Sequence, residues 1–192
     1  MTKTENFEQV EVSSSEQLRS WLEKNHQQKE SIWLVTYKKH VSGKYVSVSE
    51  ILDEILCYGW IDGVRRKVDA DRTMQLIAPR KAQHWAKTYK ERAAKLEAEG
   101  RMHAAGRAAI EQSKQSGLWN FMDDVDALIK PKDLVEALEK YPTALKNFDN
   151  FPDASKRFVL RWIKLAKKAD TRAKRIEQTA SLAAQNKRIP GS

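Results

Sequence analysis

The feature that most constrains the fold is a helix over residues 47–59 whose two ends are both specified by the sequence. Ser47 and Glu50 have the spacing of a capping box, in which each side chain accepts a hydrogen bond from the backbone of the other. Apolar residues follow at helical spacing from Ile51 to Leu56. Gly59 can adopt the left-handed backbone conformation that ends many helices. The sequence therefore predicts a capped helix with one apolar face.

The end of this helix runs into the most unusual motif of the chain, Gly59-Trp60-Ile61-Asp62-Gly63, which Val64-Arg65-Arg66 follows. A large aromatic side chain and a carboxylate stand between two glycines, and two guanidinium groups come next. Glycine costs backbone entropy, and a tryptophan here would carry a large apolar surface into a turn. We interpret the motif as part of a shaped site, although it specifies no reaction.

Cys57 is the only cysteine in the sequence. A single cysteine excludes an intramolecular disulfide and argues against a cysteine-based zinc site. Its neighbours Leu56 and Tyr58 are apolar, so we interpret Cys57 as a small buried hydrophobic residue rather than a nucleophile.

Hydrophobic periodicity predicts a mixed first part of the chain and a helical second part. β-branched and aromatic residues predict strands over 31–37 and 73–78, with a short extended piece around Val10 and Val12. Caps, helical spacing and terminating glycines predict the helices. A first helix follows a capping box at 13–16, and the others cover 47–59, 82–99, 102–116, 131–138, 142–148, 153–168 and a final segment from Asp170. The predicted fold class is α+β, predominantly α-helical with a small antiparallel sheet near the N-terminal half.

The length of 192 residues allows one domain or two small ones. We expect residues 1–120 to form a mixed α/β region that carries the glycine-bracketed motif. Residues 121–192 are expected to form a basic C-terminal helical region, with one continuous domain as the alternative. We expect a polar lead-in over residues 1–12 and a loose tail over 186–192.

The net charge of +9 is concentrated at the C-terminal end. Residues 152–192 hold eleven Lys and Arg residues against three acidic ones, which accounts for +8. In the helix over 153–168, we expect Phe158, Val159, Trp162, Ile163 and Ala166 on the buried face, and in the last helix we expect Ala173, Ile176 and Ala180 to point inward. The candidate basic surface consists of Arg157, Arg161, Lys164, Lys168, Arg172 and Arg175. Such a surface can follow a phosphate backbone, but without a helix-turn-helix signature or a stacking motif, nucleic-acid binding is the less favoured alternative.

A second group of charged and aromatic residues lies in the segment from Trp60 to Trp85, which contains the second predicted strand. If residues 73–78 fold back on the segment after Gly63, arginines from both segments face one cleft. Guanidinium groups bind carboxylates and phosphates through paired hydrogen bonds, and indoles can supply a stacking surface. The candidate anion pocket consists of Trp60, Asp62, Arg65, Arg66, Arg72, Arg80, His84 and Trp85. The alternative is that Asp62 and Asp71 neutralise arginines in a turn while the tryptophans belong to the core.

The residues offer little support for catalysis. None of the four histidines has a His-x-x-x-His spacing, and there is no glycine-rich phosphate loop or nucleophile elbow. We therefore expect no metal, no cofactor and no catalytic residue. An enzyme of unassigned class remains an alternative, in which His84 and Asp62 form an acid–base pair if the fold brings them together.

Four motifs together resemble one known family. They are residues 56–63, Ala78-Pro79-Arg80-Lys81 with Trp85 after it, Glu99-Gly100-Arg101-Met102, and a basic stretch over 166–176. In order and spacing the chain is similar, from about Leu18 to its end, to the YdeI/OmpD-associated family, whose members are often labelled bacteriocin-protection proteins. That family usually has a serine on each side of the second tryptophan and an asparagine a few residues later, where this chain has His84, Ala86 and Tyr89.

The resemblance implies protection against bacteriocins or cationic antimicrobial peptides and association with an outer-membrane porin, with no agreed enzymatic mechanism. A chain with a charge of +9 repels cationic peptides, so it does not suit simple sequestration of them. We expect a non-enzymatic stress or envelope-protection protein that binds a small anionic ligand or a protein partner. No apolar run of roughly 20 residues predicts a membrane span, and no secretory signal is visible, so we expect a cytoplasmic location. The sequence leaves the oligomeric state open.

Overall fold

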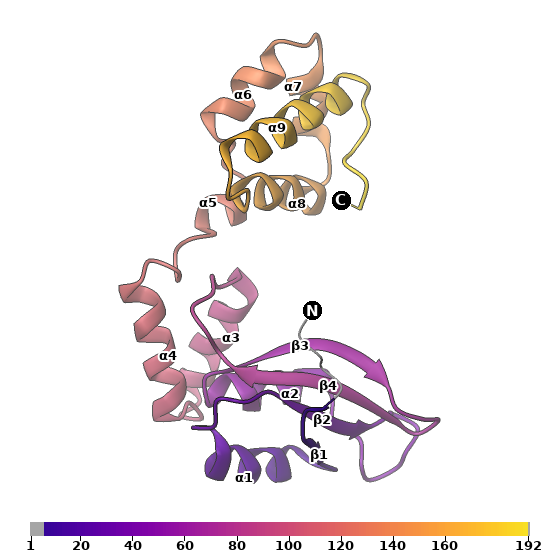
Figure 1. Cartoon of the computed structure of the whole chain (residues 1–192), viewed down its shortest axis with the longest axis vertical. Helices are drawn as coiled ribbons and strands as arrows, with labels where there is room; N and C mark the ends of the chain where they lie inside the picture. Colours follow the sequence, from indigo (N-terminus) through magenta and orange to yellow (C-terminus); the bar gives the residue numbers. More distant parts are fainter. Residues whose placement is uncertain (1–5, 192) are drawn as a thin grey trace. The chain divides into compact units, whose positions relative to one another are not determined.

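The computed structural model describes residues 6–191, which form two compact units (Figure 1). The first unit ends at Asn120 and the second begins at Phe121. Each unit has its own cluster of buried apolar side chains. The predictions for residues 1–5 and for Ser192, parts of the lead-in and the tail, lie outside the described residues.

A four-stranded sheet in the order β1-β2-β4-β3 forms the centre of the first unit. Its strands are β1 (Gln9–Glu11), β2 (Ile32–Tyr37), β3 (Trp60–Lys67) and β4 (Arg72–Pro79). β2 and β3 each pair antiparallel with β4, whereas β1 pairs parallel with β2 because the crossover helix α1 (Ser15–Asn25) connects them. The predicted α+β class, mainly helical with a small sheet in the N-terminal half, is confirmed, and the sheet has one parallel pairing.

Trp60 and Asp62 lie in β3, so their predicted placement in a turn is wrong. Residues 63–67 of β3 are all exposed, and the strand therefore lacks the apolar alternation that identifies a half-buried strand in a sequence. β3 forms because it pairs with β4, not because of its own sequence pattern. At the tip of this hairpin, an Asp69 carboxylate oxygen accepts hydrogen bonds from the backbone nitrogens of Asp71 and Arg72, at 2.9 and 2.7 Å.

The predicted ends of α2 (Val48–Cys57) are confirmed. The Ser47 hydroxyl accepts a hydrogen bond from the Glu50 backbone at 3.2 Å, and the Glu50 carboxylate accepts one from the Ser47 backbone at 2.8 Å. Gly59 has a φ of +73°, in the left-handed region. The cap of α1 lies one position later than a box over 13–16 implies, because Ser14 accepts from the backbone of Gln17.

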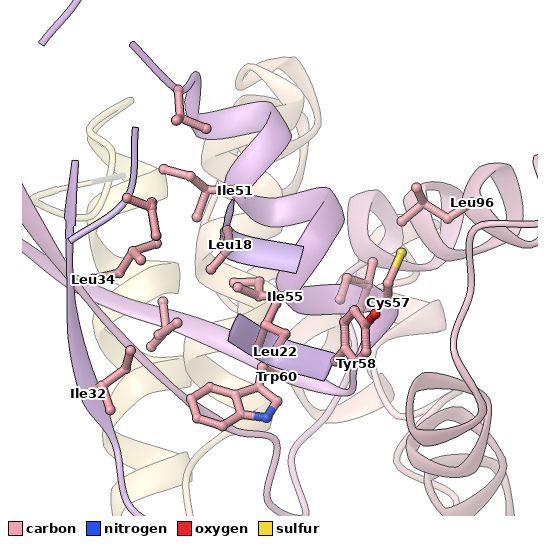
Figure 2. Close-up of a cluster of buried hydrophobic side chains, with 14 of the residues drawn as sticks. Leu18, Leu22, Ile32, Leu34, Ile51, Ile55, Cys57, Tyr58, Trp60 and Leu96 are labelled. Atoms are coloured by element: carbon pink, nitrogen blue, oxygen red, sulfur yellow. The ribbon is translucent and has the colours of Figure 1, made fainter. Parts of the chain in front are cut away.

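The apolar faces of α1 and α2 pack together against the sheet, as Figure 2 shows. Each aliphatic side chain that is fully buried there contributes about 1.5–3 kcal/mol to the hydrophobic free energy of folding. The labelled members from α1, α2 and the sheet are Leu18, Leu22, Ile51, Ile55, Cys57, Ile32, Leu34 and Trp60. Cys57 is fully buried beside them, which confirms its interpretation as a small hydrophobic residue.

α3 (Lys87–Ala98) and α4 (Ala104–Gln115) complete the first unit. α3 begins at Lys87 rather than near residue 82 because the segment before it is fixed elsewhere: Trp85 is buried, and its backbone nitrogen donates to the Leu118 oxygen at 3.3 Å. α4 lies close to the end of α2. A Cβ atom on Gly106 would lie only 2.3 Å from the Cys57 carbonyl oxygen.

The second unit is helical. It contains α5 (Asp123–Asp126), α6 (Lys132–Glu139), α7 (Ala144–Asn150), α8 (Asp153–Lys164) and α9 (Ala169–Ala184). α9 contacts α6, α7 and α8, so it is the central helix of this unit (Figure 1). Across residues 6–191, no helix has the length and apolar character needed to cross a membrane.

Three predicted packing positions in the second unit are wrong. Phe158 is 40% exposed and Leu160 is buried in its place, because α8 turns the side of Leu160 and Ile163 toward the core. Ala173 is exposed, while Ile176 and Ala180 are buried as predicted. Ile189 is buried in the same core, so this part of the predicted loose tail is packed.

An ion pair between Asp133 and Arg172 connects α6 to α9. It predicts that the free energy of unfolding of the second unit depends on pH. Two guanidinium nitrogens of Arg172 donate to the two carboxylate oxygens of Asp133, at 2.7 and 2.9 Å. These hydrogen bonds lower the pKa of Asp133 below its ordinary value, against the opposing effect of burial. A carboxylate with a lowered pKa stabilises the fold above its unfolded pKa, and this stability is lost as the pH falls through the folded pKa.

We expect Asp133→Asn to reduce the acid dependence of stability. The side chains of Asp133 and Arg172 are both partly exposed. The part of the free energy of unfolding that their ion pair contributes, and that is lost between pH 6 and pH 2, is therefore at most about 1 kcal/mol. Urea titrations of the full chain, followed by circular dichroism at several pH values, measure it. Glu136→Gln is the matched control because the Lys132–Glu136 pair is far more exposed. Identical pH profiles for Asp133→Asn and the unaltered chain contradict the prediction.

Candidate functional site

An irregularity in β3 places Asp62 and Arg65 on the same side of the sheet. Residues three apart in a regular strand point to opposite faces, but the register between β3 and β4 shifts between Asp62 and Arg65. Both side chains therefore reach Gln75 on β4: Arg65 donates to the Gln75 amide oxygen at 2.6 Å, and the Gln75 amide nitrogen donates to Asp62 at 3.0 Å.

The carboxylate of Asp62 is held from two sides. One oxygen accepts from Gln75, and the other accepts from the hydroxyl of Tyr89 in α3. Burial and this hydrogen bond raise the pKa of Tyr89 above its ordinary value, so the hydroxyl remains a donor at neutral pH. Both oxygens of Asp62 thus have donors.

Arg80 follows β4 and lies beside this carboxylate with a largely enclosed guanidinium group. The guanidinium carbon is 3.7 Å from the centroid of the Trp85 ring, and one terminal nitrogen donates to the His84 backbone oxygen at 3.2 Å. The other terminal nitrogen, Nη1, and Nε are buried and have no hydrogen-bond partner. Burial lowers the pKa of Arg80, while Tyr89 and Asp62 act in the opposite direction. We name the group the Arg80 cluster; it consists of Asp62, Arg65, Gln75, Arg80, His84, Trp85 and Tyr89.

The structure brings five of the eight predicted pocket residues into the Arg80 cluster and places the other three elsewhere. Trp60 is fully buried in the core, where its indole nitrogen donates to the His26 oxygen at 3.1 Å. Arg66 lies over the Trp33 ring at 5.0 Å. Arg72 pairs with Asp69 and Glu11, at 2.8 and 2.7 Å, near the tip of the hairpin.

Gln75 and Tyr89 are the two members of the cluster that the sequence analysis does not include. Gln75 had a recognisable signal, because it is the one polar residue inside the apolar run over 74–78 and it is buried. In the sequence, Tyr89 stands out only as a departure from the family pattern. Its hydrogen bond to Asp62 depends on how α3 packs against β3, which no local pattern specifies.

A second polar cluster joins the ends of three helices, α1, α2 and α4. The rings of His26 and His103 lie 4.9 Å apart, and Tyr58 stacks on His103 at 4.7 Å and donates to Glu23. Burial, which has the larger effect, and this hydrogen bond together raise the pKa of Tyr58 to about 12. His103 caps α4 by accepting a hydrogen bond from the Ala105 backbone, so helix capping explains the position of this ring.

The predicted basic surface is partly engaged in contacts within the second unit. Lys164 pairs with Asp124 at 2.5 Å, Arg172 pairs with Asp133, and Arg175 donates to the Trp162 backbone oxygen. Arg157, Arg161 and Lys168 are exposed. No group of three or more acidic, histidine or cysteine residues within 6–191 is arranged to hold a metal ion.

Fold and site together define a protein of two units, an α/β unit with an enclosed arginine cluster and a basic helical unit. The chain belongs to the family described as "Domain of unknown function (DUF8412)", whose model matches residues 10–109. A second family model, OmdA, described as "Bacteriocin-protection, YdeI or OmpD-Associated", matches residues 127–186. Neither a curated protein nor a solved structure matches the chain.

The second match confirms the resemblance to the YdeI/OmpD-associated family and locates it in the helical unit. The fourth motif, over residues 166–176, lies inside this match. The first three motifs lie within the residues that the other family model matches.

Proposed function

We propose that the protein is a non-enzymatic binding protein whose Arg80 cluster holds a small oxyanion, a carboxylate or a phosphate. We further propose that this binding serves a stress or envelope-protection role of the kind that the description of the C-terminal family names. One observation carries the proposal: two buried nitrogens of Arg80 have no acceptor.

An unpaired buried donor is expensive, since it loses its hydrogen bonds to water and gains none in return. Each such group costs about 1–3 kcal/mol, and groups on a charged side chain cost more. In an arginine, Nε and the terminal nitrogen Nη2 form one fork and the two terminal nitrogens form a second, and either fork matches two oxygens of a carboxylate or phosphate. Nε and Nη1 of Arg80 belong to different forks, so a bound oxyanion at either edge would give one of the two unpaired donors an acceptor.

The acidic neighbour of Arg80 supports this interpretation. Asp62 lowers the electrostatic cost of burying the guanidinium charge, but its two oxygens already accept from Tyr89 and Gln75. The negative charge of Asp62 therefore offsets the positive charge of Arg80 without a direct hydrogen bond. The unpaired N–H groups of Arg80 are left for another acceptor. Lys81, Ala82 and Gln83, in the loop that follows, are exposed and offer a route of entry.

The test is a binding experiment on the full chain with inorganic phosphate, sulfate and acetate. We expect the Arg80 Nε–H signal in ¹⁵N NMR spectra to move on addition of the anion that binds. At 100 times its Kd, a ligand stabilises the folded state by about 2.7 kcal/mol, which raises Tm by about 5–10 °C.

Arg80→Lys is the informative variant because it keeps the charge and removes the fork. We expect it to abolish the shift in Tm, while Arg157→Lys, at an exposed position of α8, leaves the shift unchanged. An unaltered chain that responds to none of the anions, or an Arg80→Lys variant that responds equally, overturns the proposal.

A further inference from the structure

The solvent-exposed face of α8 is a feature of the second unit that the proposed function does not use. α8 contacts α5 and α9 and buries Val159, Leu160 and Ile163 (Figure 1). Phe158 and Leu165, the residue that caps the helix, are each 40% exposed. Residues seven apart lie two turns along the same side of a helix. Two large apolar side chains therefore share the solvent-exposed face of α8.

Packing keeps this face directed outward. Between the two exposed side chains, the partly buried Trp162 is covered by Arg175 of α9, whose guanidinium carbon is 4.9 Å from the ring centroid. The Arg175 guanidinium group also donates to the Trp162 backbone oxygen. Turning Phe158 inward would break these contacts and expose Leu160 and Ile163. The exposure of the apolar pair is thus a property of the packed helix.

Three cations border the same face. Arg157 lies beside the first apolar residue, and Lys167 and Lys168 follow the second; all three are exposed. Within residues 6–191, none of these three side chains forms an ion pair or a hydrogen bond. Lys156 and Lys164 of α8, in contrast, pair with aspartates at 3.0 and 2.5 Å. The three cations therefore remain available to an anionic partner.

A patch with this composition is complementary to a surface that is negatively charged on the outside and apolar beneath. Residues 157–175 contain eight Lys and Arg residues against one acidic residue, Asp170, so the local potential is positive. A nucleic acid would accept hydrogen bonds from the cations but would leave Leu165 in water. A bilayer with anionic headgroups satisfies both parts of the patch, because its acyl chains receive apolar side chains.

We propose that this face of α8 binds the surface of an anionic lipid bilayer. Phe158 and Leu165 enter the boundary between headgroups and acyl chains, and the three unpaired cations contact lipid phosphates. The interaction is separate from the Arg80 cluster and does not depend on the function proposed for it.

Cosedimentation of the full chain with lipid vesicles tests the charge requirement. One set of vesicles is phosphatidylcholine alone, and the other combines phosphatidylcholine with phosphatidylglycerol in a ~2:1 ratio. We expect binding to the anionic vesicles to be at least about tenfold tighter, and to weaken as salt screens the charges. Equal binding to the two sets, or binding to neither, overturns the proposal.

A variant without the apolar pair tests insertion. We expect Phe158→Ser together with Leu165→Ser to weaken binding to the anionic vesicles at least about tenfold. Val64→Ser, at an exposed apolar position of β3, is the control and should bind as the unaltered chain does. Undiminished binding by the double variant shows that charge alone acts, and the proposal is then wrong. Circular dichroism checks that each variant folds.

Two triple variants with the same net charge separate position from total charge. The first removes the cations beside the apolar pair: Arg157→Gln, Lys167→Gln and Lys168→Gln. The second removes three exposed cations of α6, its C-terminal cap and α7: Lys132→Gln, Lys140→Gln and Lys146→Gln.

We expect the first triple variant to lose at least about tenfold in binding to the anionic vesicles, because each cation near such a surface contributes a factor of about five. The second should keep most of its binding, and equal losses overturn the proposal. Fluorescence anisotropy with a labelled DNA duplex runs in parallel. Tight binding of the duplex without binding of vesicles assigns the cations to nucleic acid and rejects the lipid surface.

Discussion

Replacing Glu54 with alanine is expected to lower the free energy of unfolding by about 3–5 kcal/mol. Glu54 lies in α2 and is only 4% exposed. One carboxylate oxygen accepts from Arg19 at 2.9 Å and the other accepts from Arg101 at 2.7 Å. The side chain therefore joins α1, α2 and the segment before α4 through one buried negative charge.

The size of the effect follows from what the substitution leaves behind. Arg19 also donates to the Arg101 backbone oxygen at 3.1 Å, so the two guanidinium groups are held near one another. Without Glu54 their mutual repulsion is offset only in part, because Arg101 keeps Glu99 at 3.3 Å and Asp53 at 3.6 Å, and a cavity remains in α2. Since both arginines are partly exposed and can be hydrated, we expect a value near the lower end of the range.

Urea unfolding of the full chain at neutral pH measures this loss. Glu136→Ala is the control, because its partner Lys132 is 92% exposed and the pair contributes less than about 0.5 kcal/mol. A Glu54→Ala variant as stable as Glu136→Ala contradicts the assignment of Glu54 as the charge that joins these elements.

Gly106→Ala is the second substitution with a large expected effect. In an ordinary helix, alanine is more stable than glycine by about 1 kcal/mol. Here the added Cβ would lie 2.3 Å from the Cys57 carbonyl oxygen and 2.6 Å from the Met102 sulfur. The carbonyl cannot move alone, since it also accepts from the His103 backbone nitrogen at 3.1 Å.

We therefore expect Gly106→Ala to separate α2 from α4 and to destabilise the first unit by about 3 kcal/mol despite the better helix propensity. Thermal unfolding followed by tryptophan fluorescence measures it. Gly117→Ala is the comparison: it has a positive φ but open space around it, so its cost is backbone strain of about 1 kcal/mol. If the two variants are equally stable, the predicted close contact between a Cβ atom at position 106 and the Cys57 carbonyl oxygen is wrong.

Local signals explain which parts of the fold the sequence predicts. The box of Ser47 and Glu50 and the left-handed Gly59 act within a few residues, so α2 is predicted correctly at both ends. β3 has no comparable signal, since its partner β4 stabilises a run of mostly exposed residues. In α8, Phe158 and Leu160 are both apolar, and only the packing of the whole second unit decides that Leu160 is buried.

The same distinction applies to the candidate site. Residue types predict arginines, a carboxylate, a histidine and indoles at the site, and five of the eight predicted residues, Arg80 among them, belong to the Arg80 cluster. Trp60 and Trp85 are chemically alike in the sequence, and both are fully buried in the core of the first unit, but a guanidinium group lies over the ring of Trp85. That difference arises from neighbours far away in the chain, as does the hydrogen bond from Tyr89 to Asp62.

The position of β3 at the outer edge of the sheet has a consequence for self-association. An edge strand presents unpaired backbone groups that another copy can extend into a larger sheet. Here the edge carries Arg65, Arg66 and Lys67 in succession, and the shifted register beside them interrupts the regular ladder. Two such edges would bring six positive charges together, so the strand that carries Asp62 and Arg65 also protects the protein against aggregation by strand addition.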